Sequence, residues 1–354
     1  TPGTDEKNIN VGASWSDYGT FVERAHATAV VTLDGAGHIE TDETFYNLTV
    51  NTTSTTTGHY VFGSDITVTN NFTLTAGRFD FDASGNTFEA PNVFQINGGI
   101  FNNGSGTCNI TNSITYSAGE IQMNGGTFNV GLGTTEDLTI TGGLLDFNAG
   151  TMNVKNQVNM SSGTIDMGGG TLNVGVSVNT DAVDRFVISG GTYNLTGGEI
   201  DIQSVGGALS SDYAVDIQAG ATVGTITDGG SGNAIKLSAT NFNSSVNVNN
   251  TKKIASLEVA TGAMDAEMQD HLDCDGKVTI TSGQLNPNGK DIKLTGDWTN
   301  SSATSPGLII ASETVTFDGL SGNQNIGGTQ STTFYDLIIN NTFATGLVDL
   351  DVIT

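Results

Sequence analysis

A short motif recurs along the chain at intervals of 20 to 24 residues, and it constrains the fold more than any other feature of the sequence. Each unit reads apolar-x-apolar, then Thr/Ser-x-Gly, then two more alternating apolar segments separated by a Gly turn. Leu138–Val154 (LTITGGLLDFNAGTMNV) is a clear example. The first turns begin at Thr75, Asn97, Ser117, Thr141 and Ser161, which are 22, 20, 24 and 20 residues apart. Self-similarity of this length is typical of solenoids, in which no single unit buries its apolar face alone.

Each unit contains three segments with the two-residue alternation of a β-strand. Three strands in 20–24 residues predict an all-β chain, an elongated right-handed parallel β-helix (β-solenoid) with one rung per repeat. The 48 glycines are expected at the corners, where a backbone with positive φ is needed. Helical composition is found only in Ala263–Leu272 (AMDAEMQDHL), and all other stretches have the composition of strands and turns.

The alternating apolar residues predict a stacked core rather than a ligand groove, because the aromatic and Met stripes coincide with the repeat. The first strand of each rung supplies Phe72/Leu74, Phe94/Ile96, Ile114/Tyr116, Leu138/Ile140 and Val158/Met160. The second supplies Phe79/Phe81, Ile121/Met123, Leu145/Phe147, Ile165/Met167 and Tyr193/Leu195. The third supplies Phe88/Ala90, Cys108/Ile110, Phe128/Val130, Met152/Val154, Leu172/Val174 and Ile200/Ile202.

A second, longer period relates the two ends of the sequence. VTLDG at Val31–Gly35 recurs as VTFDG at Val315–Gly319, and TFYNLTV at Thr44–Val50 recurs as TFYDLII at Thr333–Ile339, at offsets of 284 and 289 residues. Trp15 and Trp298 hold nearly equivalent places, and Asp65–Val68 is expected to correspond to Asp349–Val352. The predicted organisation is an entry segment (1–30), a continuous solenoid (31–297) and the start of a second copy of the N-terminal module (298–354). The chain is expected to be a segment of a longer tandem array, or an open-ended rod completed by a neighbour.

The pattern TVTFDG…TFYDLIINN, together with DITVTNNFTLTAGRFDF, resembles the repetitive β-helical surface proteins of bacteria and archaea. These include adhesins, sheath and surface-layer components, and extracellular fibres. The resemblance implies a non-enzymatic structural protein at the cell surface that self-assembles into a filament, sheath or layer. The alternatives are the stalk of an adhesin and, less favoured, a polysaccharide-active β-helix enzyme. The resemblance supplies no active-site residue.

The formal charge of −26, from 37 acidic against 11 basic residues, excludes nucleic acid as the main partner and disfavours membranes. The expected partners are other copies of the chain, neighbouring repeats of a longer chain, or surface glycans. No cofactor is expected except calcium, which takes carboxylate oxygens. The candidate calcium ligands are Asp270, Asp273, Asp275, Asp349 and Asp351.

The outward positions of successive rungs carry carboxylates and amides. Asp146 and Asp166 fall one rung apart and are candidates for an acid–base pair. The nearby basic residues are scattered over different positions, so a solvated face is favoured and no catalytic residue is assigned. Asn109, Asn129, Asn153 and Asn173 are expected to form a hydrogen-bonded ladder.

Two further residue sets concern covalent modification. Cys108 and Cys274 fall in apolar slots many rungs apart, which predicts buried free thiols, or else an intermolecular disulfide. N-x-S/T sequons make several asparagines glycosylation candidates on an extracellular chain. These candidates are Asn47, Asn51, Asn71, Asn109, Asn159, Asn194, Asn243, Asn249, Asn300 and Asn340.

Overall fold

The structure is a computed structural model that describes residues 8–15, 29–54, 59–62, 64–82, 84–90, 92–133, 135–176, 185–205, 212–227, 234–241, 243–304, 306–320, 322–343 and 348–350. These residues form strands and turns and contain no helix. The strands are parallel and stack into a β-solenoid of about 13 turns, which confirms the predicted fold class. The chain divides into two units, residues 1–155 with 162–165, and residues 156–161 with 166–354.

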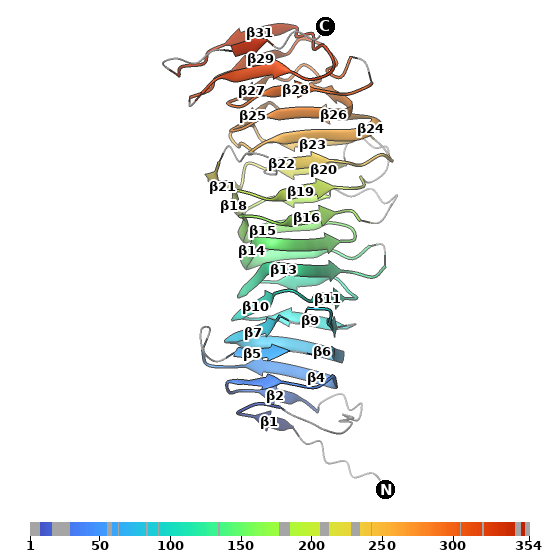
Figure 1. The fold of residues 1–354 in the computed structure, drawn as a ribbon, viewed down its shortest axis with the longest axis vertical. Helices are drawn as coiled ribbons and strands as arrows, with labels where there is room; N and C mark the ends of the chain where they lie inside the picture. Colours follow the sequence, from blue (N-terminus) through green and yellow to red (C-terminus); the bar gives the residue numbers. More distant parts are fainter. Residues whose placement is uncertain are drawn as a thin grey trace. The chain divides into compact units, whose positions relative to one another are not determined.

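The first unit consists of three parallel ladders whose strands lie above one another (Figure 1). Its strands are β1 (Ile9–Val11), β2 (Val31–Leu33), β3 (Gly37–Ile39), β4 (Glu43–Asn51), β5 (His59–Phe62), β6 (Ile66–Ala76), β7 (Arg78–Phe81), β8 (Thr87–Ala90), β9 (Val93–Ile96), β10 (Ile100–Asn103), β11 (Thr107–Ile110), β12 (Ile114–Tyr116), β13 (Glu120–Val130) and β14 (Leu138–Val154). The pairing begins at β1, where Ile9 lies beside Val31. One inward stack then runs through Leu48, Phe72 and Phe94.

Every residue predicted to face inward is buried in the structure. Aromatic rings of successive coils stack along the core, with Phe72 and Phe94 at a centroid distance of 5.2 Å and Phe79 and Phe101 at 5.3 Å. Phe72 also meets Phe79 edge to face at 5.0 Å. This aromatic cluster fixes the register, because a slip of one residue would turn each ring outward.

Glycine is required at the corner that Gly99, Gly119 and Gly143 share. Their φ angles are 74°, 76° and 78°, in the left-handed region. A Cβ on Gly143 would lie 2.6 Å from the carbonyl oxygen of Gly119, and one on Gly119 would lie 2.8 Å from that of Gly99. Neither contact is tolerable, so these corners explain why the repeat retains Gly.

The second unit is built in the same way. Its strands are β15 (Val158–Met167, shared with the first unit), β16 (Thr171–Val174), β17 (Phe186–Ile188), β18 (Gly191–Leu195), β19 (Glu199–Ile202), β20 (Tyr213–Ile217), β21 (Ala221–Ile226), β22 (Ala234–Leu237), β23 (Ser244–Val248), β24 (Leu257–Met268), β25 (Leu272–Cys274), β26 (Val278–Asn286), β27 (Ile292–Leu294), β28 (Trp298–Asn300), β29 (Thr314–Phe317), β30 (Gln324–Gly327), β31 (Asp336–Ile339) and β32 (Val348–Leu350). Strands β25, β27, β29 and β31 form a separate four-stranded sheet.

The helical composition of Ala263–Leu272 does not produce a helix. Residues up to Met268 belong to β24, where Ala266 and Met268 are buried. Ala266 pairs with Ser244 on one side and with Leu285 on the other. Burial between two neighbouring coils therefore overrides the local helix propensity.

The N-terminal module (Trp15 with residues 29–51) and the C-terminal module (Trp298 with residues 314–339) share their internal pairing. Val31 pairs with Leu48 in the first, and Val315 pairs with Leu337 in the second. Each tryptophan pairs with an isoleucine, Trp15 with Ile39 through an isolated bridge and Trp298 with Ile326 in the ladder.

The aromatic contacts agree as well. Trp15 meets Phe45 at 5.7 Å and 71°, and Trp298 meets Phe334 at 5.3 Å and 70°. The indole of Trp15 donates to Glu43 Oε1 at 3.0 Å, and that of Trp298 donates to Thr332 Oγ1 at 3.1 Å.

The expected correspondence of Asp65–Val68 with Asp349–Val352 fails. Ile66 pairs with Glu43, the residue at the position of Thr332 in the other module. Leu350 instead pairs with Ile326. By its pairing, β32 takes the place of β5, which lies beside Ile39. The local sequence similarity therefore assigned β32 to the wrong position in the module. Residues 351–354 lie outside the described part of the chain.

Candidate functional site

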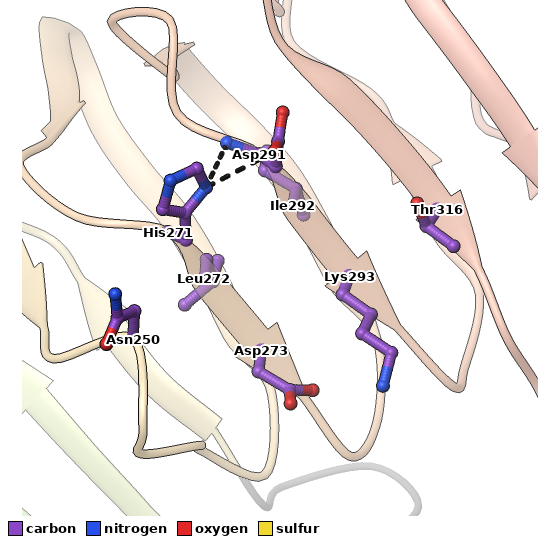
Figure 2. Close-up of a pocket in the computed structure, with 8 residues that line it drawn as sticks. All are labelled: Asn250, His271, Leu272, Asp273, Asp291, Ile292, Lys293 and Thr316. Atoms are coloured by element: carbon purple, nitrogen blue, oxygen red, sulfur yellow. Dashed lines mark hydrogen bonds and ion pairs between the residues drawn. The ribbon is translucent and has the colours of Figure 1, made fainter.

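The outer face of β25 and β27 carries a hollow (Figure 2). Leu272 and Ile292, two buried residues of these strands, line its base, and the other lining side chains are polar. The lining consists of Asn250, His271, Leu272, Asp273, Asp291, Ile292, Lys293 and Thr316. Most of these groups are polar or charged, whereas small-molecule sites are usually lined by apolar side chains.

His271 and Asp291 join two successive coils at one edge of this hollow (Figure 2). Nδ1 of His271 accepts the backbone N–H of Asp291 at 2.9 Å and lies 3.4 Å from its Oδ2. Oδ1 of Asp291 accepts the backbone N–H of Thr314 at 2.9 Å. These contacts link the corners of three coils. Nδ1 of His271 is already engaged as a hydrogen-bond acceptor.

A mixed-charge cluster lies beside these residues. Lys293 Nζ is 2.7 Å from Asp318 Oδ2, and Lys253 forms an ion pair with Asp275. Desolvation raises the pKa of Asp273, which Asp275 and Asp318 raise further while Lys293 and Lys253 oppose the shift. The hydrogen bond to Asp318 raises the pKa of Lys293. The ammonium groups of Lys253 and Lys293 thus oppose the negative charge of the cluster. Its three carboxylates belong to Asp273, Asp275 and Asp318.

Of the candidate calcium ligands, Asp273 and Asp275 lie together in this mixed-charge cluster, whereas Asp270 makes separate contacts. Asp270 accepts the backbone N–H groups of Asn250 at 3.1 Å and His271 at 2.8 Å. Asp349 is exposed on β32, and Asp351 lies outside the described residues. Within the described ranges, no group of three or more His, Cys, Asp or Glu side chains is arranged to hold a metal ion.

The outward polar ladders are largely engaged in hydrogen bonds along the stack. Asn129 donates to Asn109 at 2.7 Å, and Asn153 donates to Asn129 at 2.8 Å. Asp146 accepts from Asn148 at 2.9 Å, and Asp166 lies near the end of β15. Such ladders stabilise stacked strands and leave the amide groups little freedom.

The strongest pKa shifts belong to groups inside the core. Burial raises the pKa of the Cys108 and Cys274 thiols and of the Tyr116 and Tyr193 hydroxyls. Both cysteines are free and fully buried, and their thiols are held protonated. These shifts follow from packing and do not mark a cleft with tuned acid and base groups.

The glycosylation candidates differ in accessibility. Asn47 and Asn300 are buried, whereas Asn51, Asn243 and Asn340 are exposed. The other candidates, Asn71, Asn109, Asn159, Asn194 and Asn249, are half-buried. A glycan on the folded chain fits best at the three exposed asparagines.

The clearest surface feature is an open apolar edge on the C-terminal module. Leu337 and Ile339 of β31 continue the inward stack above Val315 and Phe317, yet they are 41% and 56% exposed. Ile338 between them is 49% exposed. Within the described ranges β31 pairs only with β29, and no described strand pairs with its other edge.

The sequence alone did not identify this edge. The two-residue alternation of a strand is the same whether or not a neighbouring strand covers it. Tyr335, directly before β31, and Phe343, four residues after Ile339, are exposed too. Large exposed apolar patches mark interaction surfaces on soluble proteins.

No model of a known protein family matches the chain, and neither curated protein sequences nor solved structures give a significant match. None of the described residues forms an apolar helix of the length needed to cross a bilayer.

Proposed function

We propose that this chain is a non-enzymatic structural protein of an extracellular, cell-surface assembly. Copies associate through their open coils and outer faces to build a filament, sheath or layer. The observation that carries the proposal is the open edge of β31, where Leu337 and Ile339 hold core positions of the repeat but lie exposed.

Elementary energetics favour covering this edge. Exposed apolar side chains gain about 25 cal/mol for each Å² removed from water. The unpaired N–H and C=O groups of an edge strand form a template for a further strand. In the N-terminal module the same positions, Leu48 and Val50, are fully buried by the next coil.

Charge and sequence pattern support the cellular setting. The net charge of −26 suits a surface exposed to solvent and cations rather than to nucleic acid. The repeat pattern resembles that of bacterial and archaeal surface proteins, which supports an extracellular location. Exposed sequons such as Asn51 and Asn243 are compatible with glycosylation there.

The non-enzymatic role is supported by where the perturbed groups lie. The buried Cys and Tyr side chains owe their shifted pKa values to desolvation in the core. Of the two candidate catalytic carboxylates, Asp146 is engaged by a neighbouring amide.

Sedimentation velocity over a range of concentrations, combined with electron microscopy, tests the proposal. We expect concentration-dependent association and regular filaments or layers. Particles that stay single at all concentrations would contradict assembly and favour the adhesin stalk. Polysaccharide turnover that Asp146→Asn and Asp166→Asn abolish would instead establish an enzyme.

A further inference from the structure

We propose that Asn288 is a site of spontaneous covalent modification, at which the folded chain loses ammonia and forms aspartate and isoaspartate. The reaction needs no enzyme and no co-reactant except water. The inference goes beyond the proposed function, because it holds whether or not copies of the chain assemble.

The chemistry requires an asparagine that is followed by a glycine. The glycine backbone nitrogen attacks the side-chain amide carbon of the asparagine, and the new C–N bond closes a succinimide ring. The attacking nitrogen gives up its proton, and the amide nitrogen takes up a proton and leaves as ammonia. Water then opens the ring at either carbonyl, which yields aspartate or isoaspartate. Glycine favours the attack because it has no Cβ to hinder the approach to its nitrogen.

The chain contains four Asn-Gly pairs, and the structure holds them in different ways. They are Asn97–Gly98, Asn103–Gly104, Asn124–Gly125 and Asn288–Gly289. Asn103 is fully buried, and its amide donates to the carbonyl oxygen of Gly125 at 3.4 Å. Asn124 belongs to an amide ladder, in which it donates to Asn102 and accepts from Asn148. Neither side chain can turn toward the next backbone nitrogen without breaking these contacts.

Asn97 is exposed, but it lies in a corner that is stacked on the preceding coil. Its backbone N–H donates to the carbonyl oxygen of Leu74 at 2.8 Å. A Cβ on Gly98 would come within 2.7 Å of the Thr75 carbonyl oxygen, so the glycine backbone is packed against that coil. Reaction at Asn97 therefore requires local opening of the corner.

Asn288 lies in an exposed turn between β26 and β27. Its φ is 52° and that of Gly289 is 71°, as in a type I′ turn. The backbone N–H of Lys290 closes the turn by donating to the Pro287 carbonyl oxygen at 2.9 Å. Among the residues that the structure describes, none hydrogen-bonds to the Asn288 side-chain amide or to the Gly289 N–H. Both reacting groups are thus available without opening the core.

Modification here changes the corner that leads into β27. Either product adds a carboxylate, and isoaspartate also lengthens the backbone of the turn by one methylene group. Asp291 links this coil to its neighbours, because its N–H donates to His271 Nδ1 and its Oδ1 accepts the N–H of Thr314, each at 2.9 Å. These contacts lie closest to the modified turn and are the part of the fold that it disturbs.

Peptide mapping by mass spectrometry after incubation at mildly alkaline pH tests the proposal. The folded chain is digested at intervals, and each Asn-Gly peptide is followed for the mass gain of deamidation. We expect Asn288 to react first, at least about tenfold faster than Asn103 and Asn124, which corresponds to about 1.4 kcal/mol in the activation barrier. No reaction at Asn288, or a reaction at any other pair that is as fast, would overturn the proposal.

Two controls separate the effect of the fold from that of the sequence. In the chain unfolded in urea, the four pairs should react at similar rates, because the fold no longer holds any of them. Asn288→Gly retains a residue that adopts positive φ and removes the reactive amide, so its peptide should gain no mass. A preference for Asn288 that persists in the unfolded chain would assign the cause to the flanking sequence and would also overturn the proposal.

Discussion

The N-terminal and C-terminal modules have similar sequences and the same internal pairing, but they differ in what lies on their last strand. Leu48 and Val50 of the first are fully buried, whereas Leu337 and Ile339 of the second are about half exposed. The difference lies in β6, which covers β4, while within the described residues no strand covers β31. Burial in a solenoid is thus a property of the neighbouring coil as much as of the residue itself.

The tryptophan contacts are present in both modules, whether or not a further strand covers the last strand of the module. Each indole N–H finds an acceptor two residues before the phenylalanine that its ring touches. The acceptor is a carboxylate in Glu43 and a hydroxyl in Thr332, so the position is retained while the chemistry changes. The predictions below start from these matched positions.

The largest expected effect is the difference between Leu48→Ala and Leu337→Ala in the free energy of unfolding. Leu48→Ala should lower the free energy of unfolding by about 3 kcal/mol, because it opens a cavity in a packed core. Leu337→Ala should change it by less than about 0.5 kcal/mol when the chain is dilute. Urea unfolding followed by circular dichroism measures both. Equal losses would show that β31 is covered in the single chain.

The next effect concerns the indole acceptors. Glu43→Ala leaves the Trp15 N–H and the Thr41 hydroxyl without the acceptor they share, and should cost about 2 kcal/mol. Thr332→Ala removes a neutral acceptor from Trp298 and should cost about 1 kcal/mol. Glu43→Gln and Thr332→Ser retain an acceptor and serve as controls in the same unfolding measurement. A control as damaging as its alanine variant would argue against the hydrogen bond as the cause.

A smaller effect is expected in the asparagine ladder of the first unit. Asn129→Ala removes two hydrogen bonds of the ladder, the one donated to Asn109 and the one accepted from Asn153, and should cost about 1 kcal/mol. Because Asn109 and Asn129 are in contact, their double variant should deviate from additivity by about 0.5 kcal/mol or more. Strict additivity in the double-mutant cycle would show that the ladder is not a cooperative element.

The smallest effect is expected in the second unit, where charged side chains take the place of the asparagine amides of the first unit. Asp201 pairs with Lys236 in register, and Lys236 lies 3.6 Å from Glu199. Desolvation raises the pKa of Glu199, against the attraction of Lys236. The folded chain therefore binds this proton more tightly than the unfolded chain does.

Stability must then fall as the pH rises through the folded pKa of Glu199. Glu199→Gln should reduce this loss by about 0.3 kcal/mol, since solvent screens the group. Urea unfolding at pH values from about 4 to about 7 measures the difference, starting near the reference pKa of Glu. A steeper loss in the variant would reverse the assigned sign.

Much of the fold could be predicted because the repeat combines a two-residue alternation with regular Gly corners. That combination placed residues such as Phe72, Phe79 and Phe88 in the core, and it aligned Asn109 with Asn129. These features depend on local periodicity, which a single sequence displays directly.

Features that depend on the neighbouring coil could not be predicted. Ala263–Met268 has helical composition, yet its flanking coils impose a strand. Leu350 takes its partner from β30, although its sequence resembles that around Ile66. The outer hollow near His271 combines side chains from separate coils, whose lateral register no local pattern fixes.

Hydrogen exchange of β4 and β31 in one sample tests the central claim most directly. We expect the amides of β4 to be protected at every protein concentration. The β31 amides that do not bond to β29 should exchange rapidly in dilute protein and become protected as copies associate. Slow exchange of those amides at all concentrations, or rapid exchange within assembled material, would contradict the account.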